Sequence, residues 1–286
     1  MQIGIFFCSK NMGIKVAIQG IQGSFHHQVA HRYFGEAIGL NECATFRDVV
    51  NSLKNNQSDK AIMAIENSIA SAILPNYALI DSYDLHIIGE HFLDIHMNLM
   101  VLPGQTIEDI KEVHSHPIAL LQCANFFSQY PHIKLVESSD TAITAKRIQE
   151  NQLKEIGALA GPVASEIYNL EIIADGIHTV KSNKTRFVVL KASNKEIPKE
   201  LINKASMKFE LDDTPGSLAT VLNVMNNCKL NLTKIQSLPI IETPFTYAFF
   251  VDVVFEKYKH FEKAKKVMEI MTTHFKVLGE YEKSKQ

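Results

Sequence analysis

The sequence has no tryptophan, no long apolar run and no excess of either charge. A helix that crosses a bilayer needs about 20 consecutive apolar residues, so we expect no membrane partner. The 29 basic and 31 acidic residues nearly cancel, so no overall field favours nucleic acid. The apolar patch at 3–8 lacks a basic flank and a small-residue cleavage site, so we expect no signal peptide. Met12 is an alternative start to Met1, because the first expected strand begins only at Lys15.

Paired cysteines and the usual metal and nucleotide motifs are also missing. The four cysteines are widely spaced and form no C-x-x-C: Cys8, Cys43, Cys123 and Cys228. This spacing favours reduced thiols in the cytoplasm over disulfides or a zinc site. There is no H-E-x-x-H, and His114 and His116 lack a third ligand. The glycine stretch at 20–23 is shorter than the dinucleotide and P-loop fingerprints, so we expect neither a metal nor a cofactor.

Apolar strand patterns alternate with helical patterns over the first 190 residues. We expect strands at 15–18, 43–46, 60–65, 85–89, 91–102, 111–114, 133–136, 156–160 and 188–190. Such alternation predicts an α/β fold of parallel sheets with helices on both faces. Ligands of these sheets bind beyond the carboxyl ends of the strands, which directs attention to the residues that follow each strand.

A small hydroxyl residue stands at four of the switches from strand to helix. These residues are Ser24, Ser68, Ser115, and Ser139 or Thr141. Each could be only an N-cap of its helix. If several helix N-termini converge on one cleft, however, their exposed N–H groups and dipoles create an anion site. A small dianion is therefore a reasonable class of ligand.

The segment from Asn183 to Phe187 leads directly into an apolar, β-branched strand. Thr185 offers one donor and two acceptor lone pairs, and Arg186 offers a planar fork that suits a carboxylate. On its own the segment could equally be a strand start with a surface arginine.

Five motifs together resemble prephenate dehydratase, in the same order over about residues 15 to 190. They are Gly23-Ser24-Phe25, Glu66-Asn67-Ser68, Ser115-His116-Pro117, Gln122-Cys123 and Asn183-x-Thr185-Arg186-Phe187. The resemblance implies a catalytic domain at 15–192 with two lobes, like type II periplasmic binding proteins. One lobe would comprise 15–94 with 175–192, and the other 95–174.

The resemblance also implies roles for individual residues. The catalytic residues would be Thr185, Arg186, Glu66 and His116. The substrate-binding residues would be Ser24, Phe25, Asn67, Ser68, Ser115, Asn183 and Phe187. Arg186 should hold the side-chain carboxylate of prephenate, and Thr185 should donate a hydrogen bond to the departing hydroxyl, with a proton relayed from His116 or Glu66. Glu66 could equally be a structural acceptor. This chain departs from the family's usual motif at two positions: Ser71 stands where the family usually has glycine, and Asp140 where it usually has serine.

The last eighty residues, 204–286, have the pattern βαββαβ, which predicts a ferredoxin-like unit. Two of its segments resemble an ACT domain of the phenylalanine-sensing kind. The resemblance implies effector-binding residues Pro215, Gly216, Ser217, Leu218, Ala219, Gln236, Ser237, Leu238 and Pro239. Gln236 and Leu238 replace a glutamate and an arginine of the usual motif. The unit could alternatively be a docking domain without a ligand.

The resemblance therefore predicts a cytoplasmic enzyme, a homodimer or homotetramer, that converts prephenate to phenylpyruvate in phenylalanine biosynthesis and is inhibited by phenylalanine. Two rival hypotheses remain open from the sequence. The first is the same chemistry on arogenate, in which an amino group replaces the keto oxygen. The second is a non-catalytic protein that binds a small anion or an amino acid.

Overall fold

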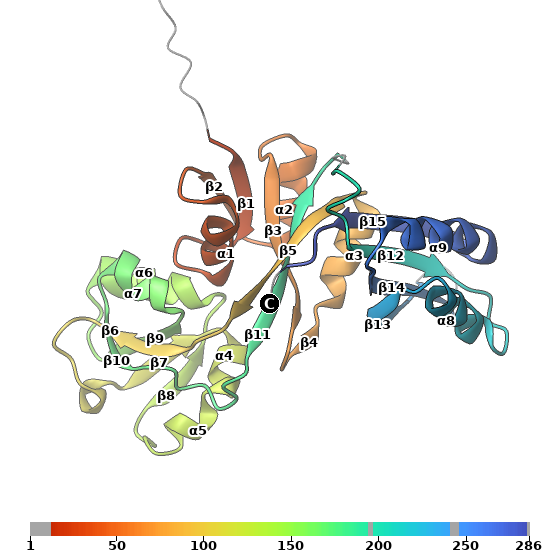
Figure 1. Cartoon of the computed structure of the whole chain (residues 1–286). Helices are drawn as coiled ribbons and strands as arrows, with labels where there is room; N and C mark the ends of the chain where they lie inside the picture. Colours follow the sequence, from red (N-terminus) through yellow and green to blue (C-terminus); the bar gives the residue numbers. More distant parts are fainter. Residues whose placement is uncertain (1–12, 194–196, 241–245, 285–286) are drawn as a thin grey trace, which may run out of the picture.

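Three β-sheets follow one another along the molecule (Figure 1). The computed structural model describes residues 13–193, 197–240 and 246–284, so Cys8 and Met12 lie outside the described residues. Each sheet has its own helices, and strand β11 runs through the centre of the molecule. The first two sheets form the lobes of the N-terminal part, and the third sheet forms the C-terminal part.

The first lobe is a mixed sheet with the strand order β2-β1-β3-β11-β5. Its strands are β1 (Lys15–Gln19), β2 (Gly39–Cys43), β3 (Lys60–Asn67), β5 (His86–Asp94) and β11 (Lys184–Lys191), and the short β4 (Ser71–Ala72) pairs with β3. Its helices are α1 (Phe25–Phe34), α2 (Phe46–Lys54) and α3 (Leu74–Ser82). Strands β1, β2 and β3 are parallel, whereas β11 runs antiparallel to both β3 and β5.

The second lobe has the strand order β10-β6-β9-β7-β8. Its strands are β6 (Asn98–Val101), β7 (Glu112–Ser115), β8 (Lys134–Glu137), β9 (Ile156–Ala160) and β10 (Glu171–Ala174). Its helices are η1 (Ile107–Asp109), α4 (Pro117–Gln122), α5 (Ala124–Phe127), α6 (Thr141–Asn151) and α7 (Pro162–Tyr168). Strands β7, β8 and β9 are parallel, so their carboxyl ends share one edge of the sheet.

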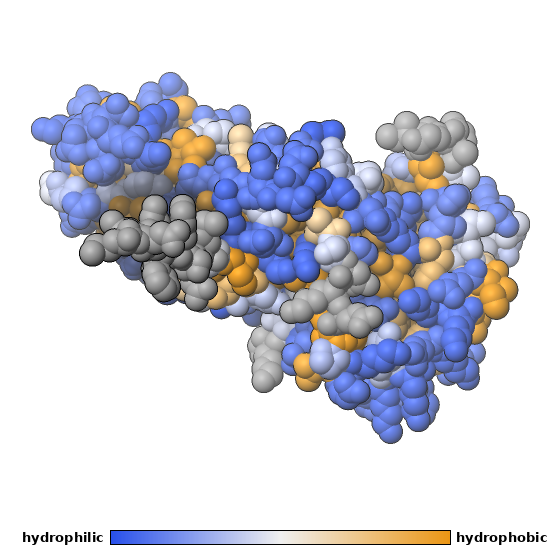
Figure 2. All heavy atoms as spheres, turned by 90° about the horizontal axis from the view of Figure 1, so that it is seen from above, coloured by the Kyte–Doolittle hydropathy of each residue, from blue (hydrophilic) through white to orange (hydrophobic). Residues whose placement is uncertain are grey.

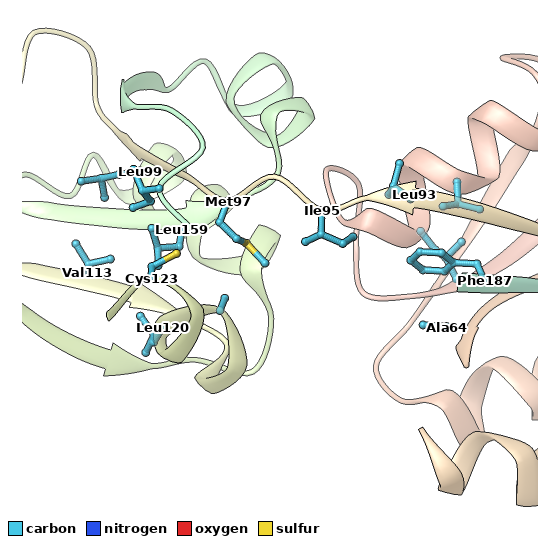
Figure 3. Packing of buried hydrophobic residues seen from close by; sticks show 14 of the residues in the cluster. Ala64, Leu93, Ile95, Met97, Leu99, Val113, Leu120, Cys123, Leu159 and Phe187 are labelled. Atoms are coloured by element: carbon cyan, nitrogen blue, oxygen red, sulfur yellow. The ribbon is translucent and has the colours of Figure 1, made fainter. Parts of the chain in front are cut away.

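The chain crosses between the lobes twice, between β5 and β6 and between β10 and β11. The two crossings are hydrogen-bonded to each other, from Ile95 N to Asn183 O at 2.8 Å and from Ile177 N to Met97 O at 2.9 Å. The side chains of Ile95 and Met97 belong to a buried apolar cluster that continues from one lobe into the other (Figure 3). The connection between the lobes is therefore packed as core rather than as an exposed linker.

The C-terminal part is an antiparallel sheet with the order β13-β14-β12-β15, and it shows the expected βαββαβ sequence of elements. Its elements are β12 (Lys204–Glu210), α8 (Ser217–Asn227), β13 (Asn231–Pro239), β14 (Tyr247–Val254), α9 (Tyr258–Met271) and β15 (Thr273–Tyr281). One face of the sheet packs with α8 and α9. The other face contributes Phe250, Leu278 and Tyr281 to a cluster shared with the first lobe.

Close contact between the two parts requires a glycine. A Cβ atom at Gly279 of β15 would lie 2.2 Å from the backbone oxygen of Ile87 in β5. No side chain fits there, so the bare backbone of Gly279 allows the C-terminal sheet to rest directly on the first lobe.

Three expectations from the sequence were wrong in detail. The strand expected at 43–46 lies earlier, at Gly39–Cys43, because Thr45 and Asp48 form a capping box that begins α2 at Phe46. The expected strand at 91–102 is interrupted, since β5 continues to Asp94 and the chain then crosses to the second lobe. The sheets are mixed rather than parallel, because β6, β10 and β11 run against their neighbours.

Within the described residues, no helix is both long and apolar enough to span a bilayer. Figure 2 shows one face of the molecule, on which hydrophilic residues predominate and hydrophobic ones form small scattered groups.

Candidate active site

A cleft of about 630 Å³ lies between the two lobes, at the carboxyl ends of their parallel strands. Four helix N-termini meet there, and their N-cap residues line the cleft: Ser24 of α1, Thr45 of α2, His116 of α4 and Asp140 of α6. The condition stated for an anion site, that several helix N-termini converge on one cleft, is therefore met. The sequence alone had indicated Ser24 among these caps, but not Thr45 or Asp140.

The charge of the cleft is unusual for an anion site. Among the described residues that line it, none is lysine or arginine, and Asp140 is the one carboxylate. Attraction for an anion must therefore come from the helix N-termini, each equivalent to about half a positive charge. Backbone N–H groups at such ends bind carboxylates without any cationic side chain.

Thr185 lies in the cleft with its hydroxyl oriented by Asn67. The two residues face each other in the β11–β3 register, and Asn67 Nδ2 donates to Thr185 Oγ1 at 2.9 Å. Asn67 Oδ1 accepts the N–H groups of Ile69 and Ala70, both at 2.9 Å, which fixes the orientation of the amide. Because Thr185 Oγ1 already accepts a bond, its own proton is available to a group in the cleft.

Asn183 and Gln122 extend this network from the first lobe to the second. Asn67 Nδ2 also donates to Asn183 Oδ1 at 2.7 Å, and Asn183 Nδ2 donates to Gln122 Oε1 at 3.0 Å. Gln122 ends α4, and its backbone oxygen accepts the N–H of Thr179 at 2.8 Å. The sequence motif that contains Gln122 assigned it no role, and the structure adds it to the site.

Arg186 does not lie in the cleft, so the prediction that it holds a substrate carboxylate was wrong. Successive side chains of a strand point to opposite faces, and Thr185 and Phe187 take the cleft side of β11. The Arg186 side chain is 4% exposed and meets the C-terminal sheet instead. Its Nε donates to Glu90 Oε2 at 2.7 Å, its Nη2 to Tyr281 Oη at 3.0 Å, and its Nη1 to Asp252.

Glu66 shares that far face, which removes it as a proton donor in the cleft. Its carboxylate lies 2.9 Å from Lys234 Nζ of β13 and 3.9 Å from Arg186 Nη1. The alternation that brings Asn67 to Thr185 necessarily turns Glu66 away. Of the two interpretations left open, a structural acceptor fits, and the catalytic one was wrong.

Two predicted serines are also outside the cleft. Ser68 Oγ accepts the N–H of Lys184 at 2.9 Å and donates to the oxygen of Ser182 at 3.2 Å, so it holds the start of β11 in place. Ser115 is fully buried and donates to Leu159 O at 2.8 Å within the second sheet. Both hydroxyls are used structurally, and their prediction as substrate ligands was wrong.

His116, by contrast, is well placed to donate a proton. Its Nδ1 accepts the backbone N–H of Ile118 at 3.3 Å as the cap of α4. Nδ1 is thus used by the cap, and Nε2 is the nitrogen through which this cleft-lining ring can donate.

Phe25 and Phe187 form the apolar floor of the cleft, and His26 lines the cleft beside Phe187. The His26 and Phe187 rings meet edge to face with centroids 5.0 Å apart, and His26 Nε2 accepts the N–H of Ala64 at 3.3 Å. Burial lowers the pKa of His26 to about 3, so the ring is neutral. No pattern in the sequence distinguished His26 from its neighbours His27 and His31.

The buried, neutral His26 predicts a pH dependence of stability. The unfolded chain binds a proton at this residue below its ordinary pKa of 6.5, whereas the folded chain does so only near 3. The free energy of unfolding is therefore unaffected by protonation of His26 above pH 6.5. As the pH falls from 6.5 to about 3, it decreases by roughly 1.4 kcal/mol per pH unit. His26→Gln keeps an acceptor for Ala64 and should have a flatter profile of unfolding free energy between pH 6.5 and 5. The exposed His132→Gln should leave the slope unchanged; equal slopes in wild type and His26→Gln would contradict the assignment.

The loop beside Asn67 carries a residue in an unfavourable conformation. Ser71 has φ of 68°, in the left-handed region that glycine adopts freely. The glycine expected from the motif thus serves backbone conformation here, and the serine costs roughly 1 kcal/mol.

Within the described residues, no group of three or more histidines, cysteines, aspartates or glutamates could hold a metal ion. His114 is used otherwise, with its ring 2.8 Å from Glu112 Oε2 and 2.6 Å from Arg147 Nη2. The described cysteines Cys43, Cys123 and Cys228 are free and buried.

Fold and cleft together define a two-lobed α/β protein with a cleft between its lobes and a ferredoxin-like unit at its C-terminus. A family model described as prephenate dehydratase matches residues 16–195. The chain belongs to the prephenate dehydratase family.

Two curated relatives and one solved structure illustrate the similarity. A bifunctional chorismate mutase/prephenate dehydratase of Buchnera aphidicola subsp. Acyrthosiphon pisum (strain APS) is 32% identical over 290 residues, covering 98% of this chain and 74% of the relative. The arogenate dehydratase/prephenate dehydratase 2 of Arabidopsis thaliana chloroplasts is 33% identical over 286 residues, covering 96% and 74%. The prephenate dehydratase of Arthrobacter aurescens in complex with L-Phe superposes with a TM-score of 0.85 at 23% identity, covering 94% of this chain and 90% of that one. This last likeness concerns the fold alone.

Proposed function

We propose that this protein converts prephenate to phenylpyruvate, with Thr185 as the central catalytic residue. The observation that carries the proposal is the hydroxyl of Thr185, a residue that is 8% exposed, lines the cleft and accepts a hydrogen bond from Asn67. A hydroxyl held in this way still has its own proton to donate in a hydrogen bond. That is what a departing hydroxide needs, and membership of the family supplies the reaction.

The reaction breaks two bonds and makes the ring aromatic. The bond from the ring to its carboxylate breaks and releases carbon dioxide, and its electron pair enters the ring. The carbon–oxygen bond opposite breaks, and the hydroxide leaves as water after it gains a proton. Thr185 donates to this oxygen as it leaves, and the Nε2 proton of His116 is the source from which it is replenished.

The lack of cationic side chains among the described residues of the cleft suits this chemistry. A guanidinium on the ring carboxylate would stabilise the ground state and oppose its loss, because only binding that improves in the transition state accelerates a step. Weak attraction from the ends of α1, α2, α4 and α6 holds the dianion without such a clamp. The floor of Phe25 and Phe187 receives the ring as it becomes aromatic.

The C-terminal unit is proposed to be an ACT domain that binds phenylalanine. Gly216 has φ of 85° and begins α8, while Gln236 to Pro239 end β13, so both expected effector segments border the same sheet. The prephenate dehydratase of Arthrobacter aurescens, which shares the fold, forms a complex with L-Phe. Strand β13 also carries Lys234, whose ion pair with Glu66 leads to Asn67 and from there to Thr185.

The edge of β13 supports a homodimer or homotetramer. In the described chain β13 pairs only with β14, so its other edge is free to join a second copy. We place the enzyme in the cytoplasm, where the free, buried thiols of Cys43, Cys123 and Cys228 remain reduced.

One assay tests the proposal. With prephenate added, phenylpyruvate should form, and phenylalanine should then lower the rate. By reciprocity, a substrate analogue should weaken phenylalanine binding by the same factor that phenylalanine weakens analogue binding, which calorimetry measures. Product without inhibition would remove the effector role from Gln236 and Leu238. No product from prephenate or arogenate would instead support a non-catalytic binding protein.

A further inference from the structure

One carboxylate in the cleft is unused by the mechanism above. Asp140 caps α6, where its Oδ1 accepts the N–H of Ala142 at 2.7 Å and of Ile143 at 3.3 Å. Both capping bonds go to the same oxygen. Oδ2 therefore remains available to a group in the cleft.

Oδ2 points across the cleft toward the first lobe. A Cβ atom built on Gly20, at the turn from β1 to α1, would lie 3.1 Å from Asp140 Oδ2 and 3.4 Å from Ser24 Oγ. The free oxygen thus lies close to the opposite wall, beside Ser24, in the cleft that both residues line. His116 caps the neighbouring α4 on the same side of the cleft.

No cationic side chain among the described lining residues neutralises this carboxylate. Burial raises the pKa of Asp140, while the N–H groups of Ala142 and Ile143 and the ring of His116 act in the opposite direction. A carboxylate in this position opposes an anionic side chain and attracts an ammonium group.

We propose that Asp140 is a specificity-determining residue that raises the turnover of arogenate relative to that of prephenate, by accepting a hydrogen bond from the substrate ammonium with Oδ2. The two substrates differ only where an amino group replaces the keto oxygen. Prephenate brings a keto oxygen and a neighbouring carboxylate, which offer Asp140 only repulsion. Arogenate brings a cation that supplies the partner this carboxylate lacks. This inference rests on the proposed function.

The test compares kcat/KM for arogenate and prephenate in the full-length enzyme. Asp140→Ser and Asp140→Asn both keep a good N-cap for α6 while they remove the charge, so the helix is retained. The arogenate-to-prephenate ratio should fall roughly ten- to a hundredfold in both variants, the range for a hydrogen bond to a charged group. Asp109→Asn, which removes an exposed acid of the same lobe outside the cleft, should leave the ratio unchanged.

Two outcomes would overturn the proposal. In the first, the ratio stays constant within about twofold in both Asp140 variants. In the second, both variants lose the two activities equally and shift the pH profile of kcat, which would make Asp140 a proton donor instead. If the wild-type enzyme turned over neither substrate, the proposed function would fail separately. The calorimetric ratio of arogenate to prephenate affinity in the same variants would still decide the role of Asp140.

Discussion

Replacement of Thr185 by valine is expected to reduce kcat for prephenate by about two to four orders of magnitude. Valine has the shape of threonine but no hydroxyl, so the cleft keeps its volume and loses only the donor. The Asn67 amide retains Asn183 Oδ1 as an acceptor at 2.7 Å, which limits any rearrangement. Since the hydroxyl acts on the departing oxygen rather than on the bound ground state, KM should change little.

The matched control is Thr185→Ser, which keeps the hydroxyl and should retain most of the activity. Stopped-flow or steady-state formation of phenylpyruvate gives kcat and KM for both variants, and binding of a substrate analogue confirms an intact cleft. Near-normal turnover in Thr185→Val would remove Thr185 from the mechanism. A large rise in KM at unchanged kcat would instead make it a binding residue.

Replacement of Arg186 by methionine is expected to destabilise the protein by about 3–5 kcal/mol. The guanidinium lies between Glu90 and Asp252, both almost fully buried, and joins a strand of the catalytic lobe to β14 of the C-terminal sheet. Without it, Glu90 keeps Lys204 at 2.8 Å, but Asp252 is left with the hydroxyl of Ser206. An uncompensated buried carboxylate is costly because it has lost its hydration without a replacement.

Lys184→Met is the control for the loss of stability, since Lys184 lies two positions before Arg186 on β11. Its amino group is half exposed and 3.7 Å from Asp94, so its loss should cost less than about 1 kcal/mol. Urea unfolding measures both variants, and Arg186→Lys should lie between wild type and Arg186→Met. In the folded fraction of Arg186→Met, KM for prephenate should stay within about threefold of the wild-type value. A stable Arg186→Met variant with a KM raised a hundredfold would show instead that Arg186 binds the substrate.

The alternation of strands and helices was indicated by the sequence because helix and strand periodicities are local properties, whereas the two lobes were implied by the family resemblance. Ser24 illustrates this, because its hydroxyl at a switch from strand to helix could be identified from the neighbouring residues, and it caps α1 in the structure. The strand break at 95–97 could not be identified in this way, because Ile95 and Met97 are as apolar as the strands they join. Their burial in the core between the lobes depends on partners far away in the chain.

For the site residues, too, some features follow from neighbouring residues and others depend on contacts far apart in the chain. By itself the sequence determined the family, the order of elements and the presence of Thr185, Asn67 and His116, because motifs are written in contiguous residues. Only the tertiary structure decided which neighbour of Thr185 reaches the cleft, since strand alternation separates Thr185 from Arg186 by a whole sheet. It also decided which carboxylates pair with Arg186. Asp252 lies 66 positions further along, and the C-terminal sheet must pack on the first lobe before the two can meet.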